Sequence, residues 1–331
     1  MIKIAFFDTK EYDKTLFDKY NKDYGYEITY LESKLNSETA PLAKGYDVVC
    51  IFVNDVVDQR TIEILKECNV KLIALRCAGY NNVDMKHIPE GIQVVRVPAY
   101  SPYAVAEHTV ALLLSIDRKI YKAYQRTKKY NFTLNGLLGF DIHGKTVGVI
   151  GTGKIGKVFC QIMKGFGTRI LAYDMYPDEK AANQIGYEYV ELPKLLQESD
   201  IISLHCPLTE DNYKMINLET ISQMKDGVIL LNTSRGKLID TDSLIQKLGE
   251  GKIGGVGLDV YEDEEEYFLN DMSNSYMRDK DLSILLSMPN VVITSHQAFF
   301  TEEALNKIAS DTCKNIKDIF TKGNSENEVK V

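Results

Sequence analysis

The chain has 331 residues, enough for two domains that each build their own buried core. Hydrophobic residues make up 44% of the chain and charged residues 26%, with 22 Gly and 8 Pro, which excludes collagen-like, low-complexity and disordered chains. The formal net charge is −8 and no cluster of Lys and Arg opposes it, so nucleic acid is not an expected partner.

No apolar run approaches the length of a membrane-spanning helix, the longest lying at residues 110–116, so no membrane contact is expected. The N-terminus lacks the features of a signal peptide, and we expect the mature chain to begin at Met1. The 6 cysteines are scattered without metal-like spacing. This pattern favours reduced thiols in a cytoplasm and predicts no metal site.

Short β-branched runs alternate with helical stretches in the first hundred residues. The predicted strands are at residues 3–7, 47–53, 70–75 and 93–97. Because these runs are apolar on both faces, we expect parallel strands covered by helices. Ser101 followed by Pro102 predicts the start of a long helix, and a domain crossing near residue 100. The apolar stripe of this helix suits packing against another domain or subunit, which favours a homodimer.

A second alternating set of strands follows this helix. Its members are at residues 146–150, 169–173, 201–204, 228–231, 255–258 and 291–294. Six strands is the number in a full dinucleotide-binding sheet. Thr301 predicts the start of a final helix, which we expect to return to the first domain. Residues 323–331 are predicted to be a frayed polar tail.

A glycine-rich turn links the first strand of this second set to a helical pattern. We predict that Gly151 makes the tight turn, that Gly153 lets the backbone approach a pyrophosphate, and that Gly156 allows close helix packing. Asp174 ends the next strand, where a carboxylate accepts hydrogen bonds from a ribose diol and repels a ribose phosphate. The pattern therefore predicts NAD rather than NADP.

Reactive side chains follow the later strands of the second set. In an open parallel sheet, ligands bind beyond the carboxyl ends of the strands. A hydride-transfer enzyme acting on a keto acid needs a cation for the carboxylate, a proton donor and an acid beside that donor. Arg235, His296 and the acidic run Glu262–Glu266 supply these three groups. The residues alone do not select one acid from the run.

Motifs along nearly the whole chain resemble the NAD-dependent D-isomer-specific 2-hydroxyacid dehydrogenases, and within them the D-lactate dehydrogenase branch. The motifs are at residues 76–82, 97–102, 151–156, 205–209, 232–236, 258–264 and 294–298. The resemblance implies an α/β fold with two doubly wound parallel-sheet domains and an active-site cleft between them. A flavodoxin-like substrate-binding domain would comprise residues 1–100 and 300–331, and a Rossmann NAD-binding domain residues 101–299.

The same resemblance implies roles for individual residues. His296 would be the acid/base, Glu264 its partner and Arg235 the substrate clamp, while the amides of Ala78 and Gly79 would hold the carboxylate near Tyr100. Further cofactor contacts are implied at Lys154, Ile155, Cys206, Pro207, Asn212, Thr233, Ser234 and Asp259.

Phe52 and Phe299 correspond to substrate-pocket positions of the lactate branch. Their bulk leaves room for a methyl group, which favours the reversible reduction of pyruvate to D-lactate by a cytoplasmic enzyme. An aromatic wall also suits larger 2-keto acids such as 2-ketoisocaproate or phenylpyruvate. A non-catalytic NAD-sensing protein of the same fold is the alternative from another class.

Overall fold

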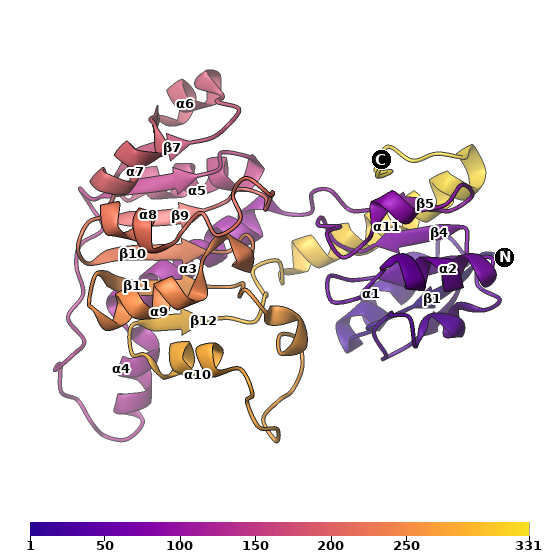
Figure 1. The fold of residues 1–331 in the computed structure, drawn as a ribbon, viewed down its shortest axis with the longest axis horizontal. Coiled ribbons are helices and arrows are strands. Elements are labelled where there is room, and N and C mark those ends of the chain that lie inside the picture. The colour runs from indigo at the N-terminus through magenta and orange to yellow at the C-terminus, as the bar shows by residue number, and fades with distance from the viewer. Residues whose placement is uncertain (331) are drawn as a thin grey trace. The chain divides into compact units, whose positions relative to one another are not determined.

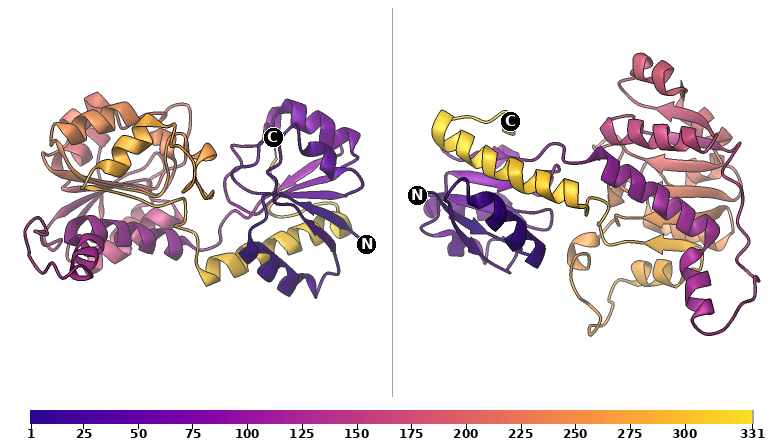
Figure 2. Two further views of the ribbon diagram at one scale, coloured as in Figure 1. Left: turned by 90° about the horizontal axis from the view of Figure 1, so that it is seen from below. Right: turned by 180° about the vertical axis from the view of Figure 1, so that it is seen from behind.

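The computed structural model describes residues 1–330 and divides into two compact units (Figure 1, Figure 2). Unit 1 comprises Met1–Ser101 together with the residues from Phe300 onward, and unit 2 comprises Pro102–Phe299. Among the described residues, no helix is both long and apolar enough to cross a membrane.

Unit 1 is built on a parallel sheet with the order β2-β1-β3-β4-β5. Its strands are β1 (Lys3–Phe6), β2 (Glu27–Tyr30), β3 (Val48–Ile51), β4 (Leu72–Leu75) and β5 (Gln93–Val95). Its helices are α1 (Glu11–Asn21), α2 (Gln59–Glu67) and α11 (Glu302–Lys322), with short 3₁₀ turns η1 (Ala40–Ala43) and η2 (Met85–His87). This order is the flavodoxin-like one, so that part of the fold prediction is confirmed.

Helices α1 and α11 pack on one face of this sheet, with α2 on the other (Figure 1, Figure 2). The final helix begins where the sequence predicted, because the Thr301 hydroxyl accepts the N–H of Ala304 at 3.3 Å. Phe17 of α1 and Ile316 of α11 are buried against the apolar side chains of the strands. The last helix of the chain therefore completes the core of unit 1.

The prediction of a frayed tail is wrong for residues 323–330. The N–H of Val329 donates to the carbonyl of Val94 at 2.8 Å, so the tail lies along β5. An edge strand exposes unpaired backbone groups, and the tail satisfies some of them here. Val331, the last residue of the predicted tail, lies outside the described residues.

Unit 2 is built on a second parallel sheet, with the order β12-β11-β10-β9-β6-β7-β8. Its strands are β6 (Thr146–Ile150), β7 (Arg169–Tyr173), β8 (Glu188–Tyr189), β9 (Ile201–Leu204), β10 (Val228–Asn232), β11 (Ile253–Leu258) and β12 (Val291–Ile293). Numbered from β6, this is the Rossmann order 3-2-1-4-5-6 with β12 added at the edge, which confirms the predicted fold class. The prediction of six strands is corrected to seven within residues 1–330, because the two-residue edge strand β8 carries no β-branched run.

The helices of unit 2 cover both faces of its sheet (Figure 1). They are α3 (Pro102–Arg118), α4 (Ile120–Thr127), α5 (Lys154–Gly165), α6 (Glu179–Ile185), α7 (Leu192–Glu198), α8 (Leu218–Gln223), α9 (Thr241–Gly249) and α10 (Lys280–Ser287). Short 3₁₀ turns η3 (Gly236–Leu238) and η4 (Glu264–Glu266) follow β10 and β11.

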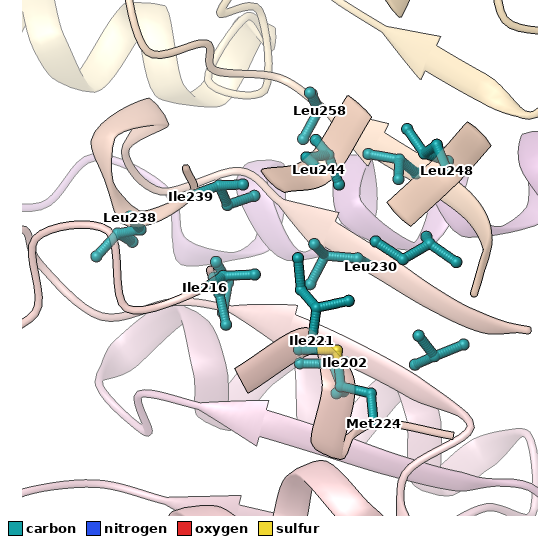
Figure 3. Close-up of a cluster of buried hydrophobic side chains, with 14 of the residues drawn as sticks. Ile202, Ile216, Ile221, Met224, Leu230, Leu238, Ile239, Leu244, Leu248 and Leu258 are labelled. Carbon is teal, nitrogen blue, oxygen red and sulfur yellow. The ribbon is translucent and has the colours of Figure 1, made fainter. Parts of the chain in front are cut away.

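Two apolar layers hold these helices to the sheet. Figure 3 shows one of them, where Ile202 and Leu230 of the strands lie with Ile221 of α8 and Leu244 of α9. The other layer holds α3 and α5, and there the apolar stripe of α3 packs against the sheet of its own unit. The expectation that this stripe serves another domain or subunit is therefore wrong, because β10 and β11 already bury it.

Candidate active site

The glycine-rich loop connects β6 to α5 and has the geometry that a dinucleotide needs. Gly151 has a φ of +96°, and a Cβ there would lie 2.5 Å from the backbone N of Cys206. A Cβ on Gly156 would lie 2.0 Å from the carbonyl oxygen of Gly151, so glycine alone fits at both positions. A Cβ on Gly153 would meet nothing within 4 Å. The space beside Gly153, at the positive end of α5, fits a pyrophosphate.

Asp174 follows β7 beside this loop, as the sequence predicted. Its Oδ2 accepts the Thr152 N–H at 2.6 Å and the Thr152 hydroxyl at 3.0 Å, while Oδ1 accepts the N–H of Tyr176 at 2.9 Å. Each carboxylate oxygen has two acceptor positions, so one position remains on Oδ1 for a ribose hydroxyl. The loop and the acid together fit the pyrophosphate and ribose of NAD.

His296 and Glu264 meet at the carboxyl edge of the same sheet. The Nδ1 of His296 lies 2.7 Å from Oε1 of Glu264, and the other oxygen of Glu264 accepts the N–H of Tyr261 at 2.9 Å. The side chains are 21% and 16% exposed, so both remain open to solvent. With Glu264 ionised, Nδ1 carries the hydrogen of this bond, which leaves Nε2 as the nitrogen that exchanges a proton.

The structure selects one member of the acidic run for contact with His296. Glu262 instead accepts hydrogen bonds from the Thr241 hydroxyl at 2.9 Å and lies 2.8 Å from the Nζ of Lys214. Glu265 lies 3.9 Å from Lys237. The acid that faces His296 is thus the one that the family resemblance selected.

Arg235 lies in the loop between β10 and η3, and a glycine fixes this loop beside the acidic run. The carbonyl of Arg235 accepts a hydrogen bond from the Asn232 side chain at 2.8 Å, and its Nη1 donates to the Ser234 carbonyl at 2.6 Å. A Cβ on Gly236 would lie 2.0 Å from the carbonyl carbon of Tyr261. The loop of Arg235 therefore packs directly on the backbone that leads to Glu264.

Asp259 holds the turn that carries His296. Its Oδ1 accepts the N–H of Gln297 at 2.9 Å, its Oδ2 accepts that of Ala298 at 2.8 Å, and its carbonyl accepts that of His296 at 2.8 Å. Burial raises the pKa of Asp259, but the nearby His108 side chain and hydrogen bonds from Thr294 and Ala298 outweigh burial and hold this pKa below its usual value. Asp259 is therefore a buried carboxylate that stays ionised.

His108 and Thr109 are consecutive residues of α3 that touch the two loops carrying Arg235 and His296, a contact that the sequence did not predict. Thr109 lies 2.8 Å from the hydroxyl of Thr233, and His108 lies 3.0 Å from that of Thr294. The one signal for this contact was the glycine-rich sequence of β11, since glycine within a strand marks a close backbone approach.

The loop after β9 contacts both the glycine-rich loop and the loop of Arg235. The Ser234 hydroxyl donates to the Cys206 carbonyl at 2.5 Å, and Asn212 donates to that of Pro207 at 2.8 Å. The ring centre of His205 lies 4.9 Å from that of Phe159 in a tilted arrangement, and burial lowers the pKa of His205 to about 3. His205 is thus a neutral residue that supports the loop. Burial also raises the pKa of the Cys206 thiol to about 11.

The remaining predicted residues divide between the two units. Lys154 and Ile155 form the first turn of α5, and Phe299 ends unit 2. Unit 1 holds the others, with Phe52 after β3, Ala78 and Gly79 after β4, and Tyr100 next to the last residue before unit 2. The carbonyl of Ala78 accepts a hydrogen bond from Arg96 at 2.8 Å. Within residues 1–330, no group of three or more His, Cys, Asp or Glu is arranged to hold a metal ion.

The sequence and the fold both match known proteins. Residues 110–298 match the model for the D-isomer specific 2-hydroxyacid dehydrogenase NAD binding domain. D-lactate dehydrogenase of Escherichia coli is 49% identical over 319 residues, covering 96% of this chain and 97% of that protein. The 2-hydroxyacid dehydrogenase homolog 1 of Schizosaccharomyces pombe is also 49% identical, covering 98% of each chain.

A solved structure extends this likeness to three dimensions. The pyruvate reductase of Chlamydomonas reinhardtii matches with a TM-score of 0.91 and 42% identity, covering 98% of each chain. The predicted family and cofactor are thus confirmed. This chain belongs to the D-isomer specific 2-hydroxyacid dehydrogenase family and is an NAD-dependent oxidoreductase.

Proposed function

We propose that this protein is a D-lactate dehydrogenase, which reduces pyruvate to D-lactate and runs in reverse with NAD. The observation that carries the proposal is the 2.7 Å contact between His296 and Glu264, on the sheet edge that also holds Arg235 and the dinucleotide loop. The full-length likeness to the D-lactate dehydrogenase of Escherichia coli supports pyruvate as the substrate.

His296 supplies the proton of the reaction. Its Nδ1 is bound to Glu264, so its Nε2 gives a proton to the carbonyl oxygen of the keto acid and takes one from the hydroxyl group in the reverse direction. Glu264 stabilises the charged imidazole and fixes the ring, since its second oxygen is held by the N–H of Tyr261.

Arg235 binds the keto acid. The guanidinium has five N–H donors in a planar fork that matches a carboxylate, which lysine does not offer. Because Gly236 lies against the backbone of Tyr261, the clamp and the proton donor are held in one fixed arrangement. Ala78, Gly79 and Tyr100 of unit 1 complete the binding of the substrate carboxylate, and Phe52 and Phe299 limit the substrate to a small side chain.

The residues that hold NAD are those of the glycine-rich loop and its surroundings. They are Gly151, Gly153, Lys154, Ile155, Gly156, Asp174, Cys206, Pro207, Asn212, Thr233, Ser234 and Asp259. The reduced cofactor, when bound, supplies the hydride for the carbonyl carbon. The first turn of α5 binds the pyrophosphate, and Asp174 binds the ribose diol.

The test is NADH oxidation by the purified protein with pyruvate, 2-ketoisocaproate and phenylpyruvate, compared by kcat/KM. We expect pyruvate to give the highest value, and D-lactate but not L-lactate to reduce NAD in reverse. A larger keto acid in first place would refute the proposed substrate and leave the dehydrogenase chemistry intact. No turnover with any of the three would instead favour a protein that only senses NAD.

The protein is proposed to act as a homodimer in the cytoplasm. Helix α4 and the loop after it carry exposed apolar side chains, among them Tyr130 at 87%, Leu134 at 81% and Leu138 at 88%. A second copy of this chain would cover such a surface. The free cysteines support a reducing compartment. Light scattering should give twice the chain mass of 37.5 kDa, and Leu138→Asp should lower this mass while Leu42→Asp, in unit 1, leaves it unchanged.

A further inference from the structure

Helix α3 lies close to β11, the strand that Asp259 follows. A Cβ on Gly255 of β11 would lie 2.5 Å from Cγ2 of Ile116, and one on Gly257 would lie 2.9 Å from Cδ1 of the same side chain. Glycine in a strand interior weakens the strand, and here it makes room for the helix. The close approach brings His108 of α3 to the carboxyl end of β11.

The hydrogen bonds of His108 fix where its proton lies. Its Nε2 is 3.0 Å from the hydroxyl of Thr294 and 3.4 Å from Oδ1 of Asp259. The Thr294 hydroxyl donates its single hydrogen to Oδ1 of Asp259 at 2.5 Å, because an ionised carboxylate only accepts. The Nε2 of His108 must therefore carry a hydrogen and donate it toward Thr294. His108, Thr294 and Asp259 form one directed chain of hydrogen bonds.

This chain ends at the backbone of the His296 turn. Asp259 accepts the N–H groups of three consecutive residues, His296 through its carbonyl, and Gln297 and Ala298 through its two carboxylate oxygens. His296 has a φ of +48°, a left-handed conformation that residues other than glycine adopt only where surrounding contacts hold it. Asp259 supplies those contacts.

We propose that His108 is a positioning residue for the reaction: by donating its Nε2 hydrogen to the Thr294–Asp259 pair, it holds the turn that aims His296 at the substrate. The proposal rests on the function proposed above, since its effect is measured on the acid/base step. His108 itself touches neither Glu264 nor Arg235 in any hydrogen bond of residues 1–330.

The test compares His108→Leu, which removes the donor, with His108→Gln, whose amide nitrogen reaches the place of Nε2. We expect His108→Leu to lower kcat at least tenfold and to change the KM of the keto acid less than threefold. His108→Gln should recover kcat to within threefold of the unmodified protein. His143→Leu is the matched control, because His143 is an exposed histidine that precedes β6, at the amino-terminal ends of the parallel strands and away from His296.

Thr294→Val gives a second route to the same chain of hydrogen bonds. It should lower kcat as His108→Leu does. The kcat of the double variant should lie within threefold of that of the slower single variant, since both substitutions act through Asp259. The inference is overturned if His108→Leu keeps the original kcat, if His108→Gln fails to recover it, or if the two losses multiply in the double variant.

A readout without turnover separates this inference from the proposed function. The hydrogen between His296 and Glu264 should give a downfield proton resonance that persists in His108→Gln and is broadened by exchange in His108→Leu. An unchanged resonance in His108→Leu would contradict the positioning role even for a protein that reduces no keto acid. Inactivity with pyruvate alone would contradict the substrate and leave the positioning role standing, since the resonance and any other keto acid still test it.

Discussion

Both units gather charged side chains at the carboxyl ends of parallel strands, and they use them in opposite ways. In unit 2, His296 and Glu264 meet with 21% and 16% of their side chains exposed. In unit 1, Arg76 follows β4 with only 2% of its side chain exposed, and Asp13 beside it is 7% exposed. The first pair is open to protons and substrate, whereas the second group is sealed inside the protein.

Arg76 organises the buried group through several weak contacts. Its Nη2 donates to the carbonyl of Asp8 at 2.8 Å, and its Nε lies 3.6 Å from the carboxylate of Asp13. The guanidinium also lies 4.4 Å from the ring centre of Phe6 and 5.0 Å from that of Phe52. In unit 1 the charged guanidinium of Arg76 thus links the ends of several strands. It also contacts Phe52, which the family resemblance places in the substrate pocket.

The difference shows that burial, more than residue type, decides what a strand-end charge does. An exposed histidine can change its protonation state within a reaction cycle, because water and substrate reach it. A buried guanidinium among carboxylates keeps its charge, and removing it leaves the acids without compensation. We therefore expect substitutions in unit 2 to change catalysis, and substitutions in the buried group to change stability.

The largest effect is expected from His296→Asn. General acid–base catalysis contributes about 10²–10⁴ in rate, so kcat should fall by roughly 10³, with Glu264→Gln giving a smaller loss. The thermal midpoint should stay near that of the unmodified protein, because the His296 side chain is outside the core. If His296→Asn kept more than a tenth of the original kcat, His296 would not be the acid/base, and the exposed charges of unit 2 would not differ in function from the buried charges of unit 1.

Arg76→Leu should act on folding instead. Breaking a buried ion pair by removing one partner destabilises proteins by about 3–5 kcal/mol, and urea unfolding measures this change directly. Arg60→Leu is the control, since Arg60 is 69% exposed and its ion pair with Glu63, at 3.4 Å, lies on the surface. We expect its effect to be less than about 1 kcal/mol. Equal decreases in the free energy of unfolding of the two variants would show that the burial of Arg76 does not increase its contribution to stability.

Asp55 is a buried carboxyl whose pKa the charge of Arg76 lowers in part, and it makes the stability of unit 1 depend on pH in a defined direction. Burial raises its pKa from 3.8 to about 6, although Arg76 and the N–H groups of Phe52 and Leu35 oppose this shift. The unfolded chain then binds fewer protons than the folded one between these pKa values, so this group stabilises the fold below about pH 4 and loses that contribution as pH rises to 6. The lost stability is about 3 kcal/mol.

Urea unfolding of Asp55→Asn across pH 4 to 7 isolates this contribution as its difference from the unmodified protein. Asp58→Asn, measured below pH 4 as well, provides a control of opposite sign, because the N–H of Thr61 lowers the pKa of Asp58 from 3.8 and its stabilising contribution is lost only as pH falls below that value. A difference curve for Asp55→Asn that is flat, or that slopes like the one for Asp58→Asn, would refute a buried carboxyl that titrates near pH 6.

The sequence predicted which side chains lie at the carboxyl ends of the strands in unit 2, because each motif follows a recognisable strand. Parallel strands end at one edge, so the glycine loop, Asp174, Arg235 and His296 had to come together once their strands were correctly ordered. Strand β2 was missed, because its residues are half-exposed and it forms the edge of its sheet. The docked tail was missed for a similar reason, since its binding depends on the backbone of β5 and not on its own side chains.

His108 shows the limit of local patterns more sharply. Its hydrogen-bond partner Thr294 lies 186 residues away along the chain, and a histidine on an apolar helix is indistinguishable from a packing residue. The group of side chains around Arg76 was not predicted either, because its members come from a helix, a strand and loops that only the folded sheet brings together. Glu264 was selected by family spacing, and the contact with His296 then gave that choice a physical reason.

The smallest predicted effect concerns Asp174, a carboxylate at the end of β7 that, like His296 and Glu264, is accessible to solvent. Asp174→Ala removes the acceptor for a ribose diol and the repulsion of a ribose phosphate, so the ratio of kcat/KM for NADH over NADPH should fall about tenfold, equivalent to about 1.4 kcal/mol. Asp178→Ala is the control, because Asp178 follows shortly after but its carboxylate is bound to Lys157 at 2.6 Å. The ratio of kcat/KM for NADH over NADPH should not change in Asp178→Ala. If Asp178→Ala lowered the ratio as much, general negative charge near β7 would set the preference for NADH, and the specific contact of Asp174 with the ribose would be refuted.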